Sequence, residues 1–331
     1  MHQENPGRRG ATLIELLMSV SIGAIVISMV VGGMVSINRH MSIQTQRSLA
    51  EQEARLLADH LIDKVRMAGG GNAYPYASVW VQNNATGGGS DAVIIASLAN
   101  FSLQAFGTYP SGGQLVVLSS SGSACVLNNG WLHRHLMVVD RQERFWSTWY
   151  IQAVNTVSCS LTVVNSVETG LNYLPSGVVT AGVMVRLAVV ELIRLRLDES
   201  TEQLLQEEDA DNNNTLESTL LADRVVDLQA ALGYDISPWN WRVDDTGDTG
   251  DEWLYNAFGD ALGRTTSQRL GGAKRTDLRM LRISVMVEAP VRGTQITTAN
   301  RLLDGPVRTR QNQVMGIGTV SVGLRNYNIL R

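Results

Sequence analysis

The longest apolar segment of the chain lies near its N-terminus. From Leu16 to Ile37, 22 consecutive residues carry no charged side chain, and about 20 such residues are needed to cross the hydrocarbon core of a membrane. Eleven of the 22 are Leu, Ile or Val, each of which favours insertion by about 0.3 to 0.6 kcal/mol near the bilayer centre. The pattern predicts a membrane-spanning helix. The length of the segment and its lack of charge disfavour the alternative, a buried core helix.

Helical spacing of apolar residues continues beyond this segment, with charged residues between them, as in an amphipathic helix with one buried face. The apolar positions are Leu49, Ala50, Ala54, Leu57, Leu61, Val65 and Ala68. Gly69-Gly70-Gly71 follows, and glycine commonly ends a helix because it adopts the left-handed conformation readily. We therefore predict one helix over residues 11–68, about 85 Å long at 1.5 Å per residue. Its first half would lie in lipid and its second half against a head domain.

After Gly71 the pattern changes to short β-rich runs separated by Gly, Ser and Asn. These runs predict strands at Ala92–Ser97, Gln114–Ser119, Leu136–Asp140, Trp149–Val154, Ser160–Val164, Met184–Leu197, Met280–Glu288 and near Thr319–Leu324. Ser218–Leu232 fits either a helix or a strand with a following turn. Glu207–Glu217 and Trp239–Gly250 lack apolar periodicity and are expected to be loops. The predicted fold class is α+β, with an antiparallel sheet packed on the amphipathic half of the long helix.

The charges beside the apolar segment predict its orientation. Arg8 and Arg9 precede it and the bulk of the protein follows it, so the short N-terminus is expected to stay cytoplasmic. A cleaved secretory signal has an apolar stretch of only about 7 to 15 residues, which is shorter than the one here. We therefore expect a single-pass protein with three parts: a leader over residues 1–10, the helix over 11–68 with its transmembrane part at about 16–37, and an outward-facing head over 69–331.

Composition and motifs exclude several classes of function. Lys+Arg 27 against Asp+Glu 31 leaves a net charge of -4, so there is no overall positive field to bind nucleic acid. The five histidines do not assemble a metal site, and neither a phosphate-binding loop of the Walker type nor a zinc-protease or serine-hydrolase motif occurs. We expect no enzymatic activity, and an anchored periplasmic enzyme is the least favoured alternative.

Glu15 lies at the start of the apolar region, where an ionised side chain costs about a few kcal/mol unless it is paired. Arg8 and Arg9 lie on the far side of Gly10, and the helix supplies no cation on its outward side. The partner is therefore expected to come from another molecule or from a new positive group. Cleavage after Gly10 would create one, the α-amine of Ala11.

This N-terminal sequence resembles the signal of type IV pilins and type II secretion pseudopilins. The likeness rests on the basic leader, Gly10, the run Ala11-Thr12-Leu13-Ile14-Glu15 and the long apolar helix. It implies cleavage after Gly10 by a prepilin peptidase and methylation of the new N-terminal residue, Ala11, which stands where Phe is commonest in the family. It also implies that Glu15 pairs with an N-terminal amine during filament assembly. Ala24, Ser28, Gly32 and Ser36 form a ridge of small side chains along the helix, and we interpret it as a packing surface in a bundle of such helices.

Scattered matches further along the chain resemble the PilW-type minor pilins of type IV pili. They are residues 89–93, 224–229, 233–235, 281–285 and 324–326. The resemblance implies a structural subunit of a minor-pilin complex that primes pilus assembly and sits at the tip. Implied partners are other minor pilins, the major pilin and a PilY1-type tip adhesin, and the protein would lie in the inner membrane and then in the surface pilus. The alternative is a J-type pseudopilin of type II secretion, which shares some of these matches.

The remaining candidate chemistry is one disulfide and two acidic runs. Cys125 and Cys159 lie in strand-like surroundings in a compartment predicted to be oxidising, which favours a disulfide over two separate buried thiols. That bond would close a loop of about 35 residues and stabilise the head by about 3 to 4 kcal/mol in the chain-entropy model.

Both acidic runs have spacings that suit calcium in part. Asp209-x-Asp211-x-Asn213 places oxygen atoms at alternate positions, as an EF-hand loop does, but Leu220 stands where that loop has its twelfth-position Glu. In the other run, Asp245, Asp248 and Asp251 are spaced three apart. A solvated acidic turn is the favoured interpretation of both runs, with calcium as the alternative, and no other cofactor or metal is expected.

Overall fold

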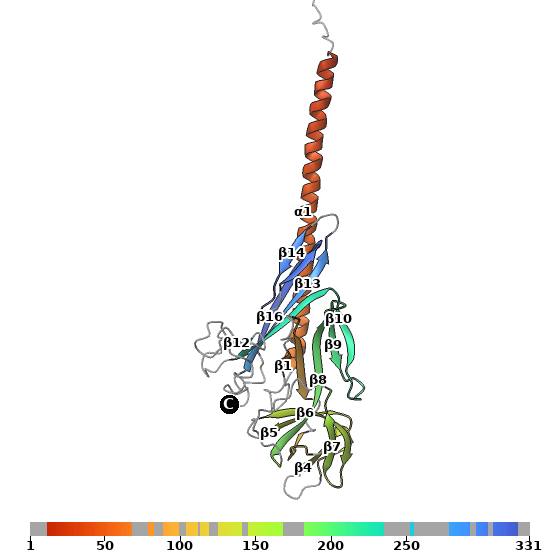
Figure 1. The fold of residues 1–331 in the computed structure, drawn as a ribbon, viewed down its shortest axis with the longest axis vertical. Helices are drawn as coiled ribbons and strands as arrows, with labels where there is room; N and C mark the ends of the chain where they lie inside the picture. The colour runs from red at the N-terminus through yellow and green to blue at the C-terminus, as the bar shows by residue number, and fades with distance from the viewer. Residues whose placement is uncertain are drawn as a thin grey trace, which may run out of the picture.

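A computed structural model of the 331-residue chain shows one long helix whose second half packs against an antiparallel β-sheet head (Figure 1). The structure describes residues 12–67, 79–82, 89–98, 104–111, 113–118, 125–140, 145–167, 182–234, 252–254, 278–291, 296–303 and 307–323. The α+β class predicted from the sequence is confirmed.

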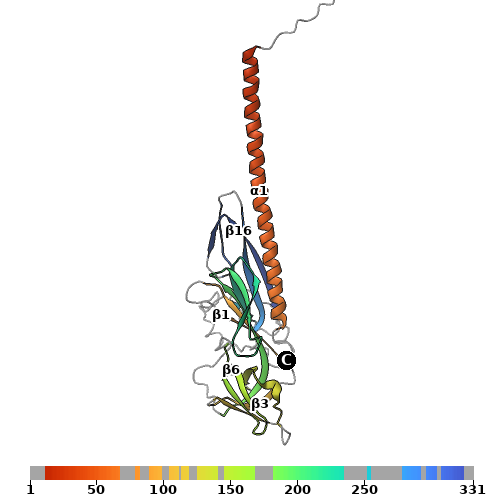
Figure 2. The same cartoon turned by 90° about the vertical axis from the view of Figure 1, so that its right-hand side faces the viewer.

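Helix α1 runs from Leu13 to Met67 without interruption. Its N-terminal half projects from the head as a rod (Figures 1 and 2). The large apolar side chains between Leu13 and Ile37 are between 47% and 80% exposed, so the described part of the head does not cover them. Among the described residues, α1 is the one helix that is long and apolar enough to cross a membrane. Its bounds fall within the predicted 11–68, and Gly69-Gly70-Gly71 lies outside the described residues.

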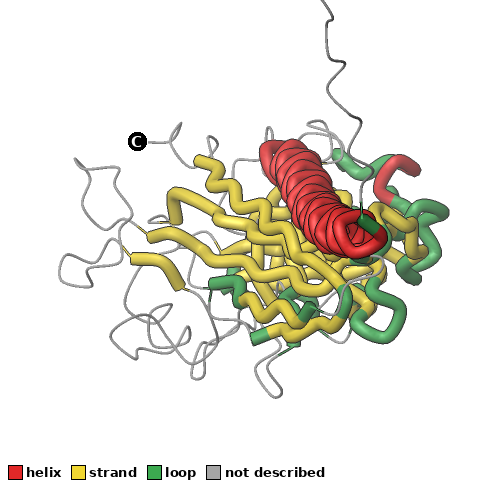
Figure 3. Tube along the Cα trace, turned by 90° about the horizontal axis from the view of Figure 1, so that it is seen from above, coloured by secondary structure: helices red, strands yellow, loops and turns green. Residues whose placement is uncertain are grey.

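The second half of α1 lies across a four-stranded antiparallel sheet (Figure 3). The strand order is β12-β11-β13-β16. The strands are β11 (Val225–Tyr234), β12 (Glu252–Leu254), β13 (Leu278–Pro290) and β16 (Gln313–Gly323). Helix α1, which we call the stem, makes most of its contacts with β16 and β13. It therefore packs mainly on these two strands.

Small residues let helix and sheet approach closely. Ala50 and Ala54 of α1 are fully buried, and they face Gly316 and Gly318 of β16. A Cβ atom at Gly318 would lie 2.2 Å from the carbonyl oxygen of Ala54, which no side chain tolerates. The backbones of the two elements are therefore in direct contact, which fixes the position of the stem along the sheet.

Strand β8 (Met184–Asp198) is long, and its two halves belong to two different parts of the head, a second sheet and a barrel. Its C-terminal half pairs with one strand on each side and lies in the middle of a sheet of order β1-β2-β8-β9-β10. The other strands of this sheet are β1 (Val79–Gln82), β2 (Ala92–Leu98), β9 (Gln203–Glu208) and β10 (Glu217–Ala222). The main hydrophobic core lies between this sheet, the four-stranded sheet and α1.

The N-terminal half of β8 closes a barrel. Consecutive antiparallel pairs run β8-β3-β4-β7-β6-β5 and return to β8. The added strands are β3 (Gln104–Thr108), β4 (Gln114–Leu118), β5 (His135–Asp140), β6 (Trp146–Asn155) and β7 (Ser160–Asn165). Inward side chains fill it with a second core that includes the fully buried Trp131, from the short helix η2 (Asn129–Trp131), and Phe145. The barrel lies beyond the C-terminal end of α1 (Figure 1).

A two-stranded ribbon, β14 (Thr297–Asn300) and β15 (Arg308–Gln311), is joined to the head by ion pairs. Arg310 contacts Glu288 of β13 at 3.0 Å. Arg308 contacts Glu199 at 3.0 Å and the fully buried Asp227 of β11 at 3.5 Å. Arg308 thereby compensates the negative charge of this buried carboxylate.

All eight predicted strands are present, with shifted ends. The last one, predicted near Thr319–Leu324, begins earlier as β16. Ser218–Leu232 proves to be strand, in β10 and β11, because each run pairs with a neighbour. The expected loop Glu207–Glu217 is shorter, since its ends belong to β9 and β10. Trp239–Gly250 lies outside the described residues. Strands β1, β3, β9, β12, β14 and β15 were not predicted.

Candidate functional site

The N-terminal end of α1 carries a reciprocal pair of hydrogen bonds between Thr12 and Glu15. The backbone N–H of Thr12 donates to Oε2 of Glu15 at 2.9 Å, and the backbone N–H of Glu15 donates to Oγ1 of Thr12 at 3.4 Å. Leu13 is the first residue of the helix, so Glu15 is its third. This is a capping box, which satisfies two backbone donors that the first turn leaves unpaired.

The capping box gives Glu15 a partner that the sequence analysis missed. The carboxylate lies in the first turn of α1, where the aligned peptide dipoles favour a negative charge. The pattern Thr12-x-x-Glu15 before an apolar run is the sequence signal that would have predicted it. Gly10 and Ala11 lie outside the described residues, so the cleavage and methylation assignments stay predictions.

The ridge of Ala24, Ser28, Gly32 and Ser36 lies on the exposed half of α1. The hydroxyl of Ser28 donates to the carbonyl of Ala24 at 2.8 Å, so its polar group is satisfied within the helix. A Cβ atom at Gly32 would meet nothing within 4 Å. The ridge is therefore open for another helix to pack against it closely, and that contact stays a prediction.

Cys125 and Cys159 are joined by a disulfide, with their Cα atoms 5.5 Å apart. Cys125 precedes η2, and Cys159 ends the turn between β6 and β7. Both side chains pack against the core of the barrel. The bond thus ties the segment that leads into η2, whose Trp131 is buried in the barrel core, to the turn between β6 and β7.

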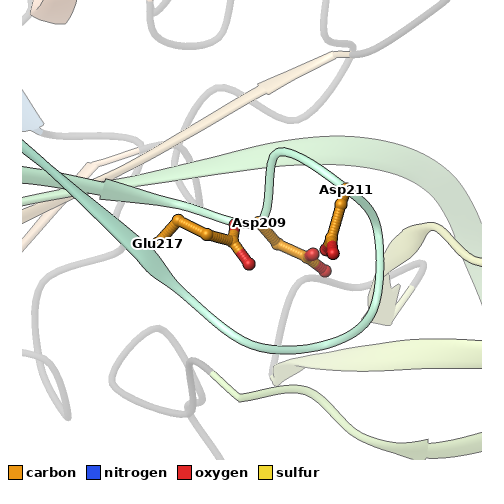
Figure 4. A group of neighbouring side chains, drawn as sticks. All are labelled: Asp209, Asp211 and Glu217. Carbon is orange, nitrogen blue, oxygen red and sulfur yellow. The ribbon is translucent and has the colours of Figure 1, made fainter.

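Three carboxylates meet at the tip of the β9–β10 hairpin, as Figure 4 shows: Asp209, Asp211 and Glu217. Their oxygen atoms lie within 4.8 Å of one another. Glu217 supplies the third carboxylate, whereas Leu220, at the twelfth position of the EF-hand template, lies in β10 and is 49% exposed. The other calcium candidates, Asp245, Asp248 and Asp251, lie outside the described residues.

Groups of the protein itself already bind the central carboxylate of this cluster. Oδ1 of Asp209 accepts the backbone N–H of Asn213, and Oδ2 accepts the backbone N–H of Asn214, both at 2.8 Å. Oδ2 also contacts Nε2 of His135 at 2.8 Å. A cation at this place would have to share Asp209 with three donors, so the contacts favour a self-capped acidic turn over a dedicated metal site.

The contact between His135 and Asp209 joins the hairpin tip to the barrel. The two side chains are only 4% and 2% exposed. Burial lowers the pKa of His135 below its ordinary value of 6.5, although the hydrogen bond and the charge of Asp209 act in the opposite direction. His133 lies just before β5 and contacts Tyr150 instead. The two histidines therefore have different hydrogen-bond partners, although both rings lie against the ring of Tyr150.

Comparison with known families adds one finding to this geometry. Residues 5–31 match the family model of the prokaryotic N-terminal methylation motif. The N-terminal segment is that of a type IV pilin-like or pseudopilin-like prepilin. This pilin-like protein combines the motif with a long apolar helix and an antiparallel head, as expected for a membrane-anchored, pilus-associated subunit. No curated protein and no solved structure matches it significantly.

Proposed function

We propose that this chain is a minor pilin of the PilW type, which is processed after Gly10, joins other minor pilins in a priming complex and occupies the tip of a type IV pilus. The single observation that carries the pilin role is the methylation motif over residues 5–31, followed by the exposed apolar half of α1. The partners are other minor pilins, the major pilin and a tip adhesin of the PilY1 type.

The shape of the head supports a place at the tip. The four-stranded sheet lies beside the stem, but the barrel lies beyond the end of α1 (Figures 1 and 2). In a fibre whose stems are parallel, a head that extends along the axis would occupy the space of the next subunit outward. A tip subunit has no such neighbour, so the same head fits there without a clash.

The capping box supports a role for Glu15 in assembly. The first turn of the helix holds the carboxylate against the backbone N–H of Thr12, the second residue after the proposed cleavage site. After cleavage, the α-amine of Ala11 becomes a cation at this end of the stem. Opposite charges attract more strongly where water is scarce, so the pair of Glu15 with an N-terminal amine, of this chain or of a neighbour, would form as the stem enters the fibre.

The test is to sequence the N-terminus of this subunit from sheared fibres of the wild type and from the membrane fraction of Glu15→Ala, and to compare how much of each protein the fibres contain. We expect a mature N-terminus at Ala11 in both proteins and loss of the variant from the fibres, with normal membrane insertion. Gly10→Val should leave a species heavier by the leader. A mature chain that begins at Met1, or piliation that is unchanged in Glu15→Ala, would contradict the proposal.

A J-type pseudopilin of type II secretion is the second candidate, because the same N-terminal motif serves both systems. Deletion of the gene separates the two. Loss of surface fibres with normal secretion supports the minor pilin, and loss of secreted proteins with normal fibres supports the pseudopilin.

A further inference from the structure

A hollow of about 490 Å³ lies where the tip of the β9–β10 hairpin meets the barrel. It is lined by His133, Tyr150 and Gln152 from the barrel side and by Asn212 and Asn213 from the hairpin loop. Its volume falls within the range of small-molecule sites. The lining combines two rings with three amides, a composition that the pilin role does not explain.

The walls of the hollow are held in place by contacts between its two sides. The hydroxyl of Tyr150 donates to the backbone carbonyl of Asn212, and Nη1 of Arg134 donates to Oδ1 of Asn212 at 3.0 Å. His133 and Asn212 both have left-handed backbones, with φ of 57° and 58°. Asn and His adopt this conformation more readily than most non-glycine residues, so the cross-contacts to Asn212 are what fix the two walls relative to each other. A site fixed in this way loses little entropy when a ligand binds.

The hydrogen-bonding groups left for a ligand follow from these contacts. Tyr150 has one hydroxyl proton, which goes to Asn212, so its oxygen accepts from Nδ1 of His133 at 3.1 Å. With its proton on Nδ1, the ring of His133 presents Nε2 as an acceptor. Arginine only donates, so Oδ1 of Asn212 faces Arg134, and its Nδ2 has no partner among the described residues. The exposed amide of Gln152 likewise has none there and offers both a donor and an acceptor.

The charge around the hollow restricts the ligand. Asp211 lies beside Asn213, whose Nδ2 donates to it at 2.8 Å. Burial raises the pKa of Tyr150, and the negative charges of Asp209 and Asp211 raise it further. Asp209 and Asp211 thus place two negative charges beside the hollow and Arg134 places one positive charge there, and this excess of negative charge disfavours phosphates, sulfates and acidic sugars. Hydroxyl groups are uncharged and both donate and accept, so they match the mixed set of groups that the walls present.

We propose that this hollow binds a neutral saccharide unit, with Asn212 and Gln152 donating to sugar hydroxyls and Nε2 of His133 accepting from one. The inference is independent of the filament role, because the site is built entirely within the head.

The test uses the full chain in lipid nanodiscs, because glycoside detergents would compete for the site. The protein is applied to immobilised neutral oligosaccharides, to sialylated and sulfated oligosaccharides, and to spermidine as a cationic probe. We expect binding to a subset of the neutral oligosaccharides. Binding to none of them, or stronger binding to the anionic set or to spermidine, would overturn the proposal.

Two variants locate the binding. Asn212→Asp keeps the acceptor for Arg134 and tolerates the left-handed backbone, but it removes the Nδ2 donor. Gln152→Ala changes an exposed side chain that folding does not need, and Gln52→Ala, at an exposed position of α1, is its matched control. Each pocket variant should weaken binding about fivefold, as expected for one lost hydrogen bond, with an unchanged melting temperature. Binding that is equal in Gln152→Ala and Gln52→Ala would show that the saccharide binds elsewhere and would overturn the assignment.

Discussion

The backbone of Gly316 in β16 lies directly against the backbone of Ala50 in α1. A Cβ atom at Gly316 would lie 2.1 Å from the carbonyl carbon of Ala50 and 2.2 Å from the amide nitrogen of Glu51. Neither of these is the end of a flexible side chain that could move aside. Contact between strand and stem therefore depends on the absence of a side chain at this position.

Gly316→Ala should accordingly separate the stem from the sheet. Overpacking of a tight core costs about 1 to 3 kcal/mol, and we expect a value at or above the upper end because the clash is with backbone. Gly323→Ala is the matched control, since it lies in the same strand and its Cβ would meet nothing within 4 Å. Chemical unfolding of the full chain in nanodiscs measures both. Equal free energies of unfolding of the two variants would show that α1 and β16 can separate at this position at no cost in stability.

The long helix could be predicted from the sequence because its signals are local. A run without charge, followed by apolar residues at helical spacing, needs no knowledge of the rest of the chain. Strand positions were also predictable, since the alternation in β4 and the apolar run of β8 are local patterns. The short β3, β14 and β15 were missed because four or five residues carry little periodicity.

Closure of the barrel could not be predicted in the same way. It depends on the pairing of β5 with β8, strands about 50 residues apart in sequence, and one β-strand pattern is compatible with many partners. The acidic loop shows the same limit at a site. The EF-hand template has its last ligand at the position of Leu220. In the structure, the hairpin register pairs Glu217 with Glu208, and the carboxylate of Glu217 comes close to Asp209. The capping box was missed although its signal is local.

Removal of the disulfide should destabilise the barrel more than the stem. Cys125 and Cys159 are 34 residues apart, and the chain-entropy model gives about 3 to 4 kcal/mol for a loop of that length. In Cys125→Ser/Cys159→Ser we expect faster amide exchange in β4, β6 and β7, with α1 and β13 unchanged. Hydrogen exchange followed by mass spectrometry resolves these segments. Equal acceleration in β13 would mean that the two cores unfold together.

Loss of the Thr12 hydroxyl should loosen the start of α1. Thr12→Val removes the acceptor for the backbone N–H of Glu15 but keeps the shape of the side chain. Loss of a cap costs about 1 kcal/mol, so exchange in the first turn should accelerate about fivefold in nanodiscs. Thr12→Ser keeps the hydroxyl and serves as the control. If both variants exchange like the wild type, the capping box does not stabilise the membrane-inserted helix.

Calcium should leave the stability of the head unchanged. Asp209 already accepts two backbone N–H groups and contacts His135. Few lone pairs of its carboxylate oxygens are therefore left to coordinate a cation. We expect no shift in melting temperature between calcium and chelator, and no heat of binding by calorimetry. A rise in melting temperature that Glu217→Gln abolishes would instead assign a calcium site to this cluster.

The contact of His135 with Asp209 should make the stability of the head depend on pH. Burial lowers the pKa of His135 below 6.5, so the unfolded chain binds this proton more readily than the folded one. Stability from this residue is therefore present above about pH 6.5 and decreases as the pH falls through that value. Glu288 has the opposite effect, because burial and the charge of Glu202 raise its pKa above 4.5.

The variant His135→Gln separates the pH dependence due to His135 from that due to Glu288. His135→Gln does not titrate and keeps a nitrogen donor for Asp209, while Glu288 is the same in both proteins. Between about pH 7.5 and about pH 5.5 the melting temperature of the wild type should fall more steeply than that of the variant. Parallel curves would mean that His135 binds its proton equally well in the folded and unfolded chain, so that the attraction of Asp209 fully offsets the effect of burial.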